Sequence, residues 1–348
     1  MFLFLLYINE KSKEELMLNS KEKIDFVILW VDGNDKEWLK EKALYDDAPK
    51  LDANRYRDCD NLQYLFRGIE KYAPWVNNIF FITWGHVPKW LDISNPRLKV
   101  VNHKEFIPEK YLPTFNSNVI ELNLHRIKEL SEKFVLFNDD FFILKNTKQT
   151  DFFVNGLPKD TFIEYMQIPS EYNDKHFFMK ANIISLLNKK FNKLGFYKNN
   201  LFKAINFRYG FQNIKTIHSS RYKKKFYGFW NLHAPQPYLK SKFVEIWNEY
   251  EEHLNIACHN KFRSSTDLGH YFIRYYQMLE GKFIPKKIES RYCRYGNDNR
   301  KLLSIIKRSK YKFICINDAY INIDFNKAIK EVNIVFEKKL NKKSKYEI

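Results

Sequence analysis

The stretch that decides the fold is residues 121–144, ELNLHRIKELSEKFVLFNDDFFIL. Its first part has a helical period, because Leu122, Ile127 and Leu130 can share one apolar face. Residues 134–137 are an uninterrupted Phe-Val-Leu-Phe, which predicts a buried strand of an α/β sheet with both faces covered. We therefore expect a helix, a central strand and a sharp turn, in this order.

Three polar residues, Asn138, Asp139 and Asp140, follow this strand and precede a second apolar run. Two adjacent carboxylates between hydrophobic segments are costly to desolvate unless a metal ion, a basic partner or solvent compensates them. In open α/β sheets, ligands bind at the carboxyl ends of the strands. The acids are thus candidates for a functional site. The alternative is a solvated turn between two strands, which an Asn-Asp-Asp sequence taken alone would favour.

The composition allows a sizeable packed core. The chain has 348 residues, enough for one large or two modest domains, and 45% hydrophobic with 17% aromatic residues excludes wholesale disorder. The four cysteines lack metal-ligand spacing, so we expect free thiols in a reducing compartment. Residues 2–8 are apolar but too short to span a bilayer, and they lack the features of a signal peptide. We expect a cytoplasmic protein, with a peripheral contact at the inner face of the membrane left open.

The net charge of +18 at pH 7 favours polyanionic partners such as nucleic acid, anionic lipid, nucleotide-sugars or an acidic polymer. The alternative is compositional, because the chain is rich in Lys, Asn, Ile and Phe throughout, as AT-rich coding would produce. No RNA-recognition, zinc-finger or helix-turn-helix signature accompanies the charge, so we expect no nucleic-acid partner.

Strand and helix patterns alternate along the first half of the chain, which predicts an α/β fold. Further strands are expected at residues 24–31, 79–83, 98–101 and 312–316. Helices are expected at residues 37–45, 61–72, 183–194, 243–254 and 268–279. The expected fold class is a Rossmann-like, GT-A-like mixed sheet with flanking helices and a helical insertion.

We expect one main domain, residues 23–320, with the helical insertion at about 151–215. The insertion has a blurred pattern that is rich in aromatic residues and lysine. A lead-in segment, residues 1–22, precedes the domain, and an exposed basic tail, residues 321–348, follows it.

Two segments near the N-terminus suit phosphate binding. Asp32, Gly33 and Asn34 follow a strand and precede a helix, as at many nucleotide sites, although Asp-Gly is also an ordinary turn. Arg55 and Arg67 lie near a helix start, and guanidinium groups match phosphate oxygens. A solvated helix face with ordinary ion pairs is the alternative for both arginines.

Two later segments hold further candidates. His233 is followed by Pro235 and Pro237, which fix the backbone of an irregular segment. A structural role is the alternative for this histidine. Arg263 precedes the helix expected at 268–279, whose positive end favours anions. The N-cap of that helix is expected at one of three residues, Ser265, Thr266 or Asp267.

Four separated blocks can be read in order along the chain. The first is IDFVILWVDGNDKEW, residues 24–38. The second comprises RYRDCDNLQYLFRGIEKYAPWVNNIFFIT, NPRLKVVNHKEFIP, LPTFNS, IELNLHRI and LFNDDFFI. The third surrounds His233, and the fourth is FRSSTDLGHYFIRYYQ, residues 262–277, with ICIND after it. Together these blocks resemble the Stealth-type sugar-phosphate transferases, which include bacterial capsular polysaccharide phosphotransferases and the catalytic subunit of the lysosomal-enzyme GlcNAc-1-phosphotransferase.

The resemblance implies transfer of a sugar-1-phosphate from a UDP-sugar to a hydroxyl of a growing capsular or cell-surface polysaccharide. A phosphodiester would form and UMP would leave, with Mg²⁺ or Mn²⁺ as cofactor. One departure is visible, because Val-Asp-Gly stands where other members often have Val-Asn-Gly, and the acid at Asp32 would alter contacts to the base or the metal. The poorly matching region 151–215 is expected to carry acceptor specificity.

The resemblance also implies roles for the matched residues. The expected metal ligands are Glu121, Asp139, Asp140 and Asp318. The expected catalytic residues are Asp140, His233, Arg263 and Arg67. The expected substrate-binding residues are Asp32, Gly33, Asn34, Arg55, Asn116, Ser117, His125, Arg126 and Asp267. The two catalytic arginines would clamp phosphoryl oxygens, and either Asp140 or His233 would take the acceptor proton.

Two other functions compete with this one. An ordinary nucleotide-sugar glycosyltransferase also uses an acidic metal motif after a strand, but it would release UDP. A non-catalytic protein that binds an acidic polymer would explain the charge. The acids at residues 138–140 argue against that last function, because bare carboxylates repel polyanions unless a metal is bound.

Overall fold

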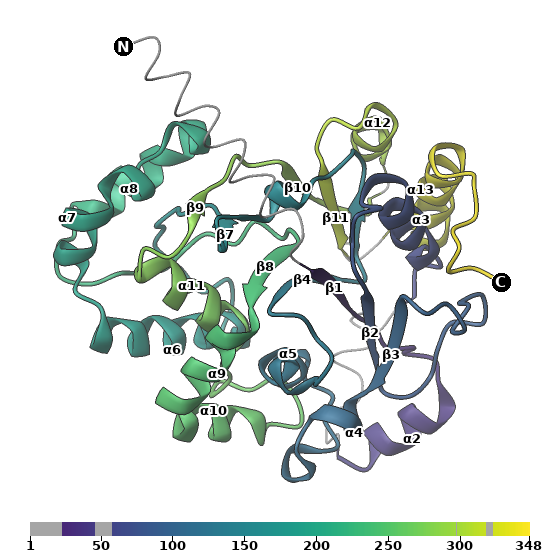
Figure 1. Cartoon of the computed structure of the whole chain (residues 1–348), viewed down its shortest axis with the longest axis horizontal. Coiled ribbons are helices and arrows are strands. Elements are labelled where there is room, and N and C mark those ends of the chain that lie inside the picture. Colours follow the sequence, from purple (N-terminus) through teal and green to yellow (C-terminus); the bar gives the residue numbers. More distant parts are fainter. Residues whose placement is uncertain (1–22, 46–57, 297, 318–322) are drawn as a thin grey trace.

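A five-stranded sheet runs through the centre of the molecule in the order β3-β2-β1-β4-β8 (Figure 1). The computed structural model describes residues 23–45, 58–296, 298–317 and 323–348. The strands are β1 (Ile24–Leu29), β2 (Ile79–Thr83), β3 (Leu98–Asn102), β4 (Lys133–Asn138) and β8 (Gln236–Leu239). The first four are parallel, and β8 is antiparallel to β4. The mixed α/β sheet predicted from the sequence is therefore confirmed.

The carboxyl ends of the parallel strands meet at one edge of this sheet. Leu29, the last residue of β1, pairs with Asn138 on β4 and with Ile82 on β2. The turn at Asp32 and the turn at Asp139 thus both leave the sheet from the same edge. This is the edge at which ligands bind in open α/β sheets.

Two smaller sheets complete the β structure. One has the order β10-β11-β5 and consists of β5 (Phe141–Ile143), β10 (Ser290–Arg294) and β11 (Phe313–Asn317). The other has the order β6-β7-β9 and consists of β6 (Phe153–Val154), β7 (Leu157–Asp160) and β9 (Ile284–Pro285). Because β4 belongs to the large sheet and β5 to a small one, the chain changes sheets at Asp139 and Asp140.

Alternate side chains of the central strands enter two different cores. Phe134 and Leu136 of β4 belong to one hydrophobic core, and Val135 and Phe137 belong to the other. This alternation follows from the period of two along a strand. Because both faces of β4 are buried, every residue from 134 to 137 is apolar. The sheet is thus covered on both faces, as the sequence predicted.

Helices supply the rest of each core. The first core contains α5 (Ser117–Leu122), α6 (Lys175–Lys190), α7 (Lys193–Ala204), α9 (Lys240–Glu249), α10 (Glu251–Cys258) and α11 (Tyr271–Leu279). The second contains α3 (Leu62–Tyr72), α12 (Arg300–Arg308) and α13 (Phe325–Lys339). The remaining helices are α2 (Lys36–Ala43), α4 (His103–Phe106) and α8 (Asn213–Ser220). None of the helices in the described ranges has the length and apolarity needed to cross a bilayer.

The helix expected after Glu121 is shorter than its apolar period suggests. Helix α5 ends at Leu122, and only a 3₁₀ turn at Leu124–Arg126 follows. The side chain of Asn123 causes the break, because its Nδ2 donates to the Val119 carbonyl at 2.9 Å and its Oδ1 accepts from Arg126. The apolar positions at 122, 127 and 130 are nevertheless all buried.

The C-terminal segment is not the exposed tail that its lysines suggested. Helix α13 buries Ala328, Val332 and Phe336 in the second core, where Phe336 stacks on Tyr64. Tyr346, two residues from the end, is only 2% exposed. The sequence expectation was wrong because the lysines of α13 occupy one face of an amphipathic helix whose other face is apolar.

Candidate active site

Asp139 and Asp140 lie at the turn between β4 and β5. The backbone carbonyl of Asp140 accepts a hydrogen bond from the Ile316 amide at 2.9 Å, which fixes the turn against β11. Cys315 donates its thiol to Asp140 Oδ2 at 3.1 Å. The other carboxylate oxygen, Oδ1, is buried and has no hydrogen-bond partner among the described residues. A buried oxygen of this kind is suited to contact a cation or a proton donor.

The environment of the pair disfavours two negative charges. Desolvation raises the pKa of Asp140 to about 6, while the thiol of Cys315 opposes the shift. Desolvation also raises the pKa of Asp139 above its ordinary value, and the charge of Asp140 adds to that effect. Although surrounding protein atoms partly desolvate the carboxylate, the Asp139 side chain keeps an exposed surface, so it can meet a ligand that approaches from outside.

Asp58 lies near this pair, and Asp32 lies near Asp58. The pKa of Asp58 is raised by desolvation and by the charges of Asp60 and Asp32, and Asp58 in turn raises the pKa of Asp139. We call Asp32, Asp58, Asp139 and Asp140 the acidic edge. Asp58 was not among the predicted site residues, although it stands beside the predicted arginines in RYRDCD.

The turn after β1 is held by a histidine that the sequence did not single out. The Asp32 amide donates to His86 Nε2 at 2.8 Å, and the Asn34 amide donates to Asp32 Oδ1 at 2.8 Å. Asp35 then caps α2 by accepting from the Trp38 amide. Asp32, Gly33 and Asn34 therefore form a fixed turn at the carboxyl edge, where the sequence placed them.

His233 lies beside the acidic edge in a strained backbone conformation. Its φ of +44° falls in the left-handed region, which is unusual for a residue other than glycine. Its ring lies 4.7 Å from the ring of Tyr292 on β10. Desolvation raises the pKa of that tyrosine, Arg294 opposes the shift and the charge of Asp140 adds to it. Tyr292 therefore contacts His233 and lies within electrostatic range of Asp140. Burial lowers the pKa of His233 itself to about 4, and Lys180 and Arg294 add to the shift.

A buried ion pair fixes the segment that carries His233. Arg274 donates to both carboxylate oxygens of Asp160, at 2.7 and 2.8 Å. The same guanidinium donates to Asn231 Oδ1 at 2.9 Å, and Asp160 also accepts from Gln236 at 3.1 Å. The chain is thus tied down two residues before His233 and three residues after it, which explains how the strained conformation is maintained.

Arg263 belongs to a second group of polar residues near the edge. Its Nη2 donates to Ser117 Oγ at 3.1 Å. Desolvation raises the pKa of the buried Glu121 to about 8, and the charge of Arg263 opposes that shift. Arg263 also lowers the pKa of His176, after desolvation and Lys180. Three of the predicted residues, Ser117, Glu121 and Arg263, therefore do come together.

Asn116 and Asp267 hold this group in position and are not open to a ligand. Asp267 is 1% exposed and accepts hydrogen bonds from the side-chain amides of Asn116, Asn118 and Asn260. It also accepts from the Ser264 amide, and α11 begins only at Tyr271. Asn116 and Asp267 therefore belong to a buried hydrogen-bond network and do not make the substrate contacts predicted for them. The predicted helix cap at Ser265, Thr266 or Asp267 is also corrected, because α11 begins later.

Glu121 does not share a metal site with the acid pair. Its carboxylate instead lies beside His270, whose Nε2 is 3.9 Å from Glu121 Oε2. Burial lowers the pKa of that histidine to about 3, and its Nδ1 contacts the Tyr238 hydroxyl at 2.5 Å. Within the described ranges, no three His, Cys, Asp or Glu side chains are grouped closely enough to hold a metal ion. Asp318, another predicted ligand, and Arg55 lie outside the described residues, as does the predicted lead-in segment.

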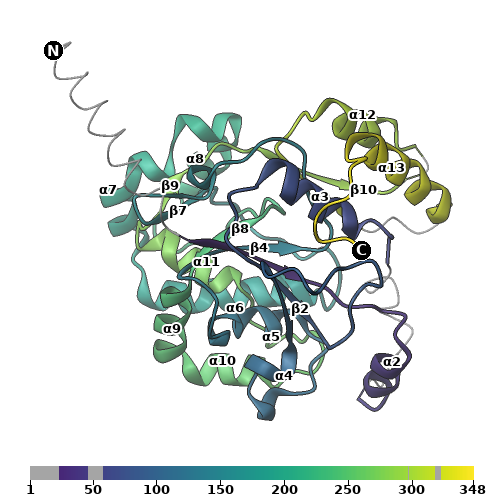
Figure 2. The same cartoon turned by 45° about the vertical axis from the view of Figure 1, so that its right-hand side comes forward.

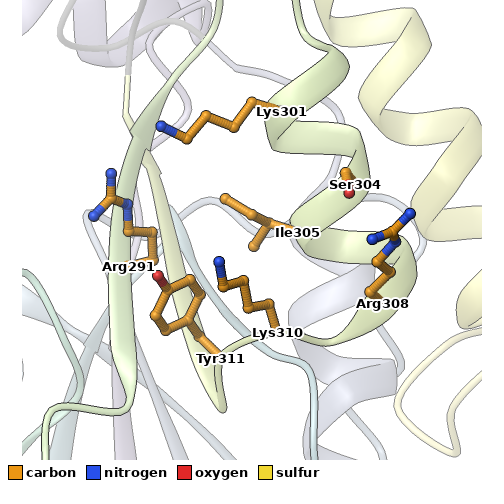
Figure 3. A pocket seen from close by; sticks show the side chains of 7 residues that line it. All are labelled: Arg291, Lys301, Ser304, Ile305, Arg308, Lys310 and Tyr311. Atoms are coloured by element: carbon orange, nitrogen blue, oxygen red, sulfur yellow. The ribbon is translucent and has the colours of Figure 1, made fainter.

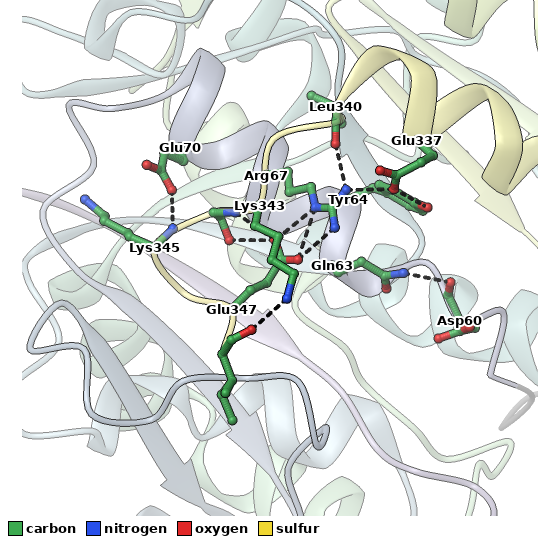
Figure 4. Close-up of polar contacts among 12 residues, drawn as sticks. Asp60, Gln63, Tyr64, Arg67, Glu70, Glu337, Leu340, Lys343, Lys345 and Glu347 are labelled. Carbon is green, nitrogen blue, oxygen red and sulfur yellow. Dashed lines mark hydrogen bonds and ion pairs between the residues drawn. The ribbon is translucent and has the colours of Figure 1, made fainter.

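Arg67 is committed to the C-terminal segment (Figure 4). Its Nε and Nη2 donate to Glu347, and its Nη1 donates to Glu337 and to the Leu340 carbonyl, at distances of 2.8 to 3.1 Å. The guanidinium is therefore fully used, and the predicted phosphate clamp at Arg67 is corrected to a structural ion pair. The partner lies 280 residues away in sequence, so no local pattern indicated it.

His125 and Arg126 also lie away from the acidic edge. The His125 ring stacks on Phe243, and the Arg126 guanidinium lies 4.8 Å from the Trp247 ring, both on α9. That helix begins directly after Leu239, which pairs with Lys133 at the amino end of β4. Their predicted substrate contact is thus corrected to packing at the opposite end of the strand.

Two cavities flank β10, one on each face. A narrow cavity of about 40 Å³ is lined by Asn138, His233, His270 and Tyr271 among others, so it adjoins the acidic edge. A larger cavity of about 600 Å³ lies against α12 and is lined by Arg291, Lys301, Ser304, Ile305, Arg308, Lys310 and Tyr311 (Figure 3). Alternation along β10 directs Arg291 to the larger cavity and Tyr292 to His233. The lining of the larger cavity includes basic side chains and no acidic one, so this cavity is not the metal-binding part of the site.

Two family models match the chain. The model of Stealth protein conserved region 1 matches residues 22–49, and that of conserved region 2 matches residues 55–160. The second range contains the acid pair and ends at Asp160. A solved structure, the apo bifunctional glycosyltransferase WbbM, aligns with 93% of this chain and 52% of its own at 11% identity, but its TM-score of 0.31 is too low to support an inference.

Full-length relatives are more similar. A capsular polysaccharide phosphotransferase, WcwK of Streptococcus pneumoniae, is 43% identical over 95% of this chain and 99% of its own length. The exopolysaccharide phosphotransferase cps2G of Lactiplantibacillus plantarum is 39% identical over 93% and 96%. The receptor polysaccharide phosphotransferase WefC of Streptococcus gordonii is 35% identical over 94% and 99%.

Proposed function

This chain belongs to the Stealth family of polysaccharide phosphotransferases, and from that premise we propose the reaction it performs. The enzyme transfers a sugar-1-phosphate from a UDP-sugar to a hydroxyl of a growing capsular or cell-surface polysaccharide. The acceptor oxygen attacks the sugar-linked phosphorus, the bond from that phosphorus to the UMP oxygen breaks, and a phosphodiester remains. The names of the relatives support the phosphotransfer and the polysaccharide acceptor.

The observation that carries the proposal is the unsatisfied oxygen of Asp140 within the acidic edge. A diphosphate donor would bring more negative charge to carboxylates that already disfavour ionisation, so a cation is needed between them. Asp139 and Asp140 fit Mg²⁺ or Mn²⁺, because both ions prefer carboxylate oxygens and accept the remaining ligands from substrate phosphates and water. When bound, the ion would neutralise charge on the diphosphate.

Two groups of this chain are suited to take the proton of the acceptor hydroxyl. Asp140 has a pKa of about 6, so it is mostly ionised at neutral pH. His233 has a pKa lowered to about 4, so its imidazole is neutral and free to accept a proton. Tyr292 contacts His233 and lies within electrostatic range of Asp140, and both Asp140 and His233 are candidates for the base.

The donor phosphates need cationic partners as well. Arg263 is the candidate among the described arginines, because a single hydroxyl, Ser117 Oγ, accepts from its guanidinium and the rest of the fork is available. The fixed turn at Asp32, Gly33 and Asn34 is the candidate contact for the nucleotide. Arg55 and Asp318 stay proposals from the sequence alone. The enzyme is further proposed to act next to the inner face of the membrane, in contact with the capsule machinery.

Analysis of the spent nucleotide tests the proposal. The protein is incubated with UDP-GlcNAc or another UDP-sugar, Mg²⁺ and an acceptor oligosaccharide, and the nucleotides are separated by chromatography. We expect UMP in amounts equal to the extended acceptor, and none with Asp140→Asn. A stoichiometric UDP peak without UMP would identify a glycosyltransferase. Binding of the acceptor without any nucleotide turnover, across a panel of UDP-sugars, would identify a non-catalytic polymer-binding protein.

A further inference from the structure

One part of the chain carries nearly all of its net charge. Residues 175–244 contain 15 Lys and Arg residues and no Asp or Glu, in a protein whose net charge is +18. Within them, α7, α8 and the basic run at 221–225 form what we call the helical corner, residues 193–225. Figures 1 and 2 show α7 and α8 at the outer margin of the molecule, away from the five-stranded sheet.

The helical corner also exposes large apolar side chains. Phe202, Phe207 and Phe211 are 85%, 81% and 90% exposed, and Ile214 is 65% exposed. Scattered surface residues of this kind are ordinary, but three nearly bare phenylalanines within ten residues form an exposed group that needs an explanation.

The segment that presents these rings is firmly anchored. Tyr209 lies between two of the phenylalanines, is only 2% exposed, and donates its hydroxyl to the Lys203 carbonyl at 2.8 Å. Asn206 Nδ2 donates to the Phe202 carbonyl, and Asn213 Nδ2 donates to the Asn206 carbonyl, both at 2.8 Å. The polar groups are thus turned inward, where they fix the backbone, while the aromatic rings are turned out.

The helical corner also carries exposed cations. Lys198, Arg221, Lys223 and Lys224 are exposed, and the exposed Arg208 guanidinium lies 4.7 Å from the Phe207 ring. Lys193 differs from these exposed cations, because it is buried and pairs with the buried Glu164 at 2.5 Å. The outer face therefore combines bare aromatic rings with cations and has no acid of its own.

We propose that the helical corner docks on an anionic lipid bilayer. Aromatic rings are favoured at the boundary between headgroups and acyl chains, and lysine and arginine are attracted to anionic headgroups within a Debye length. An acidic glycan would be attracted by the cations, whereas the interfacial region of a bilayer also takes up the Phe202, Phe207 and Phe211 rings. This surface is separate from the acidic edge, so the inference does not depend on the proposed reaction.

Vesicle co-sedimentation of the full chain tests the docking surface. The wild-type protein is compared with Phe202→Ser/Phe207→Ser/Phe211→Ser on vesicles of phosphatidylcholine mixed with phosphatidylglycerol, and on pure phosphatidylcholine. We expect the wild-type protein to bind the mixed vesicles more strongly than the pure ones. The affinity of the triple variant should fall by about tenfold or more, because it lacks the three rings that would insert into the bilayer. A second variant, Lys198→Gln/Arg208→Gln/Lys223→Gln/Lys224→Gln, should bind more weakly and lose most of its salt dependence.

A matched control replaces three exposed apolar residues elsewhere, Ile93→Ser/Ile256→Ser/Ile334→Ser, which are 59%, 52% and 47% exposed. It should bind like wild type. All variants keep residues 2–8, so any binding by that apolar run is held constant. Unchanged binding of the phenylalanine variant would overturn the proposal, as would equal binding to neutral vesicles. Binding to a soluble acidic glycan that does not need the rings, without binding to vesicles, would assign the corner to the polymer instead.

Discussion

The acidic edge and the helical corner hold their charges in opposite ways. Asp139 and Asp140 follow the buried strand β4, and backbone and thiol contacts fix Asp140 in a desolvated turn. The cations of the corner stand on exposed helices, around rings that face solvent. Charged groups that are fixed and partly desolvated can stabilise the charge that develops on a diphosphate. Charged side chains that are exposed can attract an oppositely charged surface. The difference suggests that one chain keeps reaction and attachment apart.

Removal of divalent cations should separate the two regions most sharply. With excess EDTA we expect turnover to fall to background, because the acidic edge and the donor diphosphate repel each other without a metal. Binding to anionic vesicles should persist, because the cations of the helical corner need no metal. Turnover is measured by nucleotide release and binding by co-sedimentation. Full turnover in excess EDTA would contradict the metal site at Asp139 and Asp140.

Replacement of the two candidate bases should affect only the reaction. We expect Asp140→Asn and His233→Ala each to lower turnover by roughly 10²-fold or more, the usual range for an acid–base group. Asp298→Asn, an exposed acid that pairs with Arg300, serves as the control and should keep its turnover. The pH profiles of the two variants then identify the base. Near-normal turnover in a folded Asp140 or His233 variant would remove that residue from the mechanism.

Arg67 sharpens the comparison, because it is a cation that belongs to neither region. Arg67→Met should lower the free energy of unfolding by about 3 kcal/mol, since Glu347, whose side chain is only 4% exposed, would lose its partner. The double variant Arg67→Met/Glu347→Gln should be more stable than the single one, because the buried charge is then also removed. Denaturant unfolding measures both. If Arg67→Met left stability unchanged but reduced turnover, the phosphate clamp predicted from the sequence would be restored.

Glu121 offers a pH-dependent test of desolvation at a buried carboxylate outside the acidic edge. Its folded pKa of about 8 lies above its ordinary value of 4.5, so ionisation opposes folding. The free energy of unfolding should therefore fall as pH rises from about 4.5 to about 8, by up to about 5 kcal/mol for this group. Glu121→Gln should gain stability over wild type across that window and match it in acid. A difference that does not vary with pH would show that Glu121 is not desolvated.

The central fold could be predicted because its signals are local. The run at 134–137 needed two covered faces, and β4 with its neighbours supplied them within two residues of the expected bounds. The acids after β4 and the turn at Asp32 were found for the same reason, since strand ends determine where a ligand can reach a sheet. Tyr292 was missed because an aromatic residue on an edge strand has no distinctive spacing.

The errors came from contacts between distant segments. Arg67 fits a phosphate clamp in sequence, but Glu347 reaches it only after α13 packs on α3. Asp267 fits a helix cap, but its carboxylate accepts from three asparagines, Asn116 and Asn118 at the start of α5 and Asn260 in a loop. Residue type and local pattern indicate what a side chain can do, and the tertiary partner decides which role it takes.

The central claim is attack at phosphorus, and phosphorus NMR of the extended acceptor tests it most directly. The account predicts one phosphodiester resonance per sugar added, coupled to an anomeric proton that keeps the configuration of the donor, because the anomeric bond is never broken. The same experiment with Asp140→Asn should give no such resonance. An extended acceptor that contains the sugar but no phosphorus would contradict the account, since the sugar would then have been transferred through its anomeric carbon.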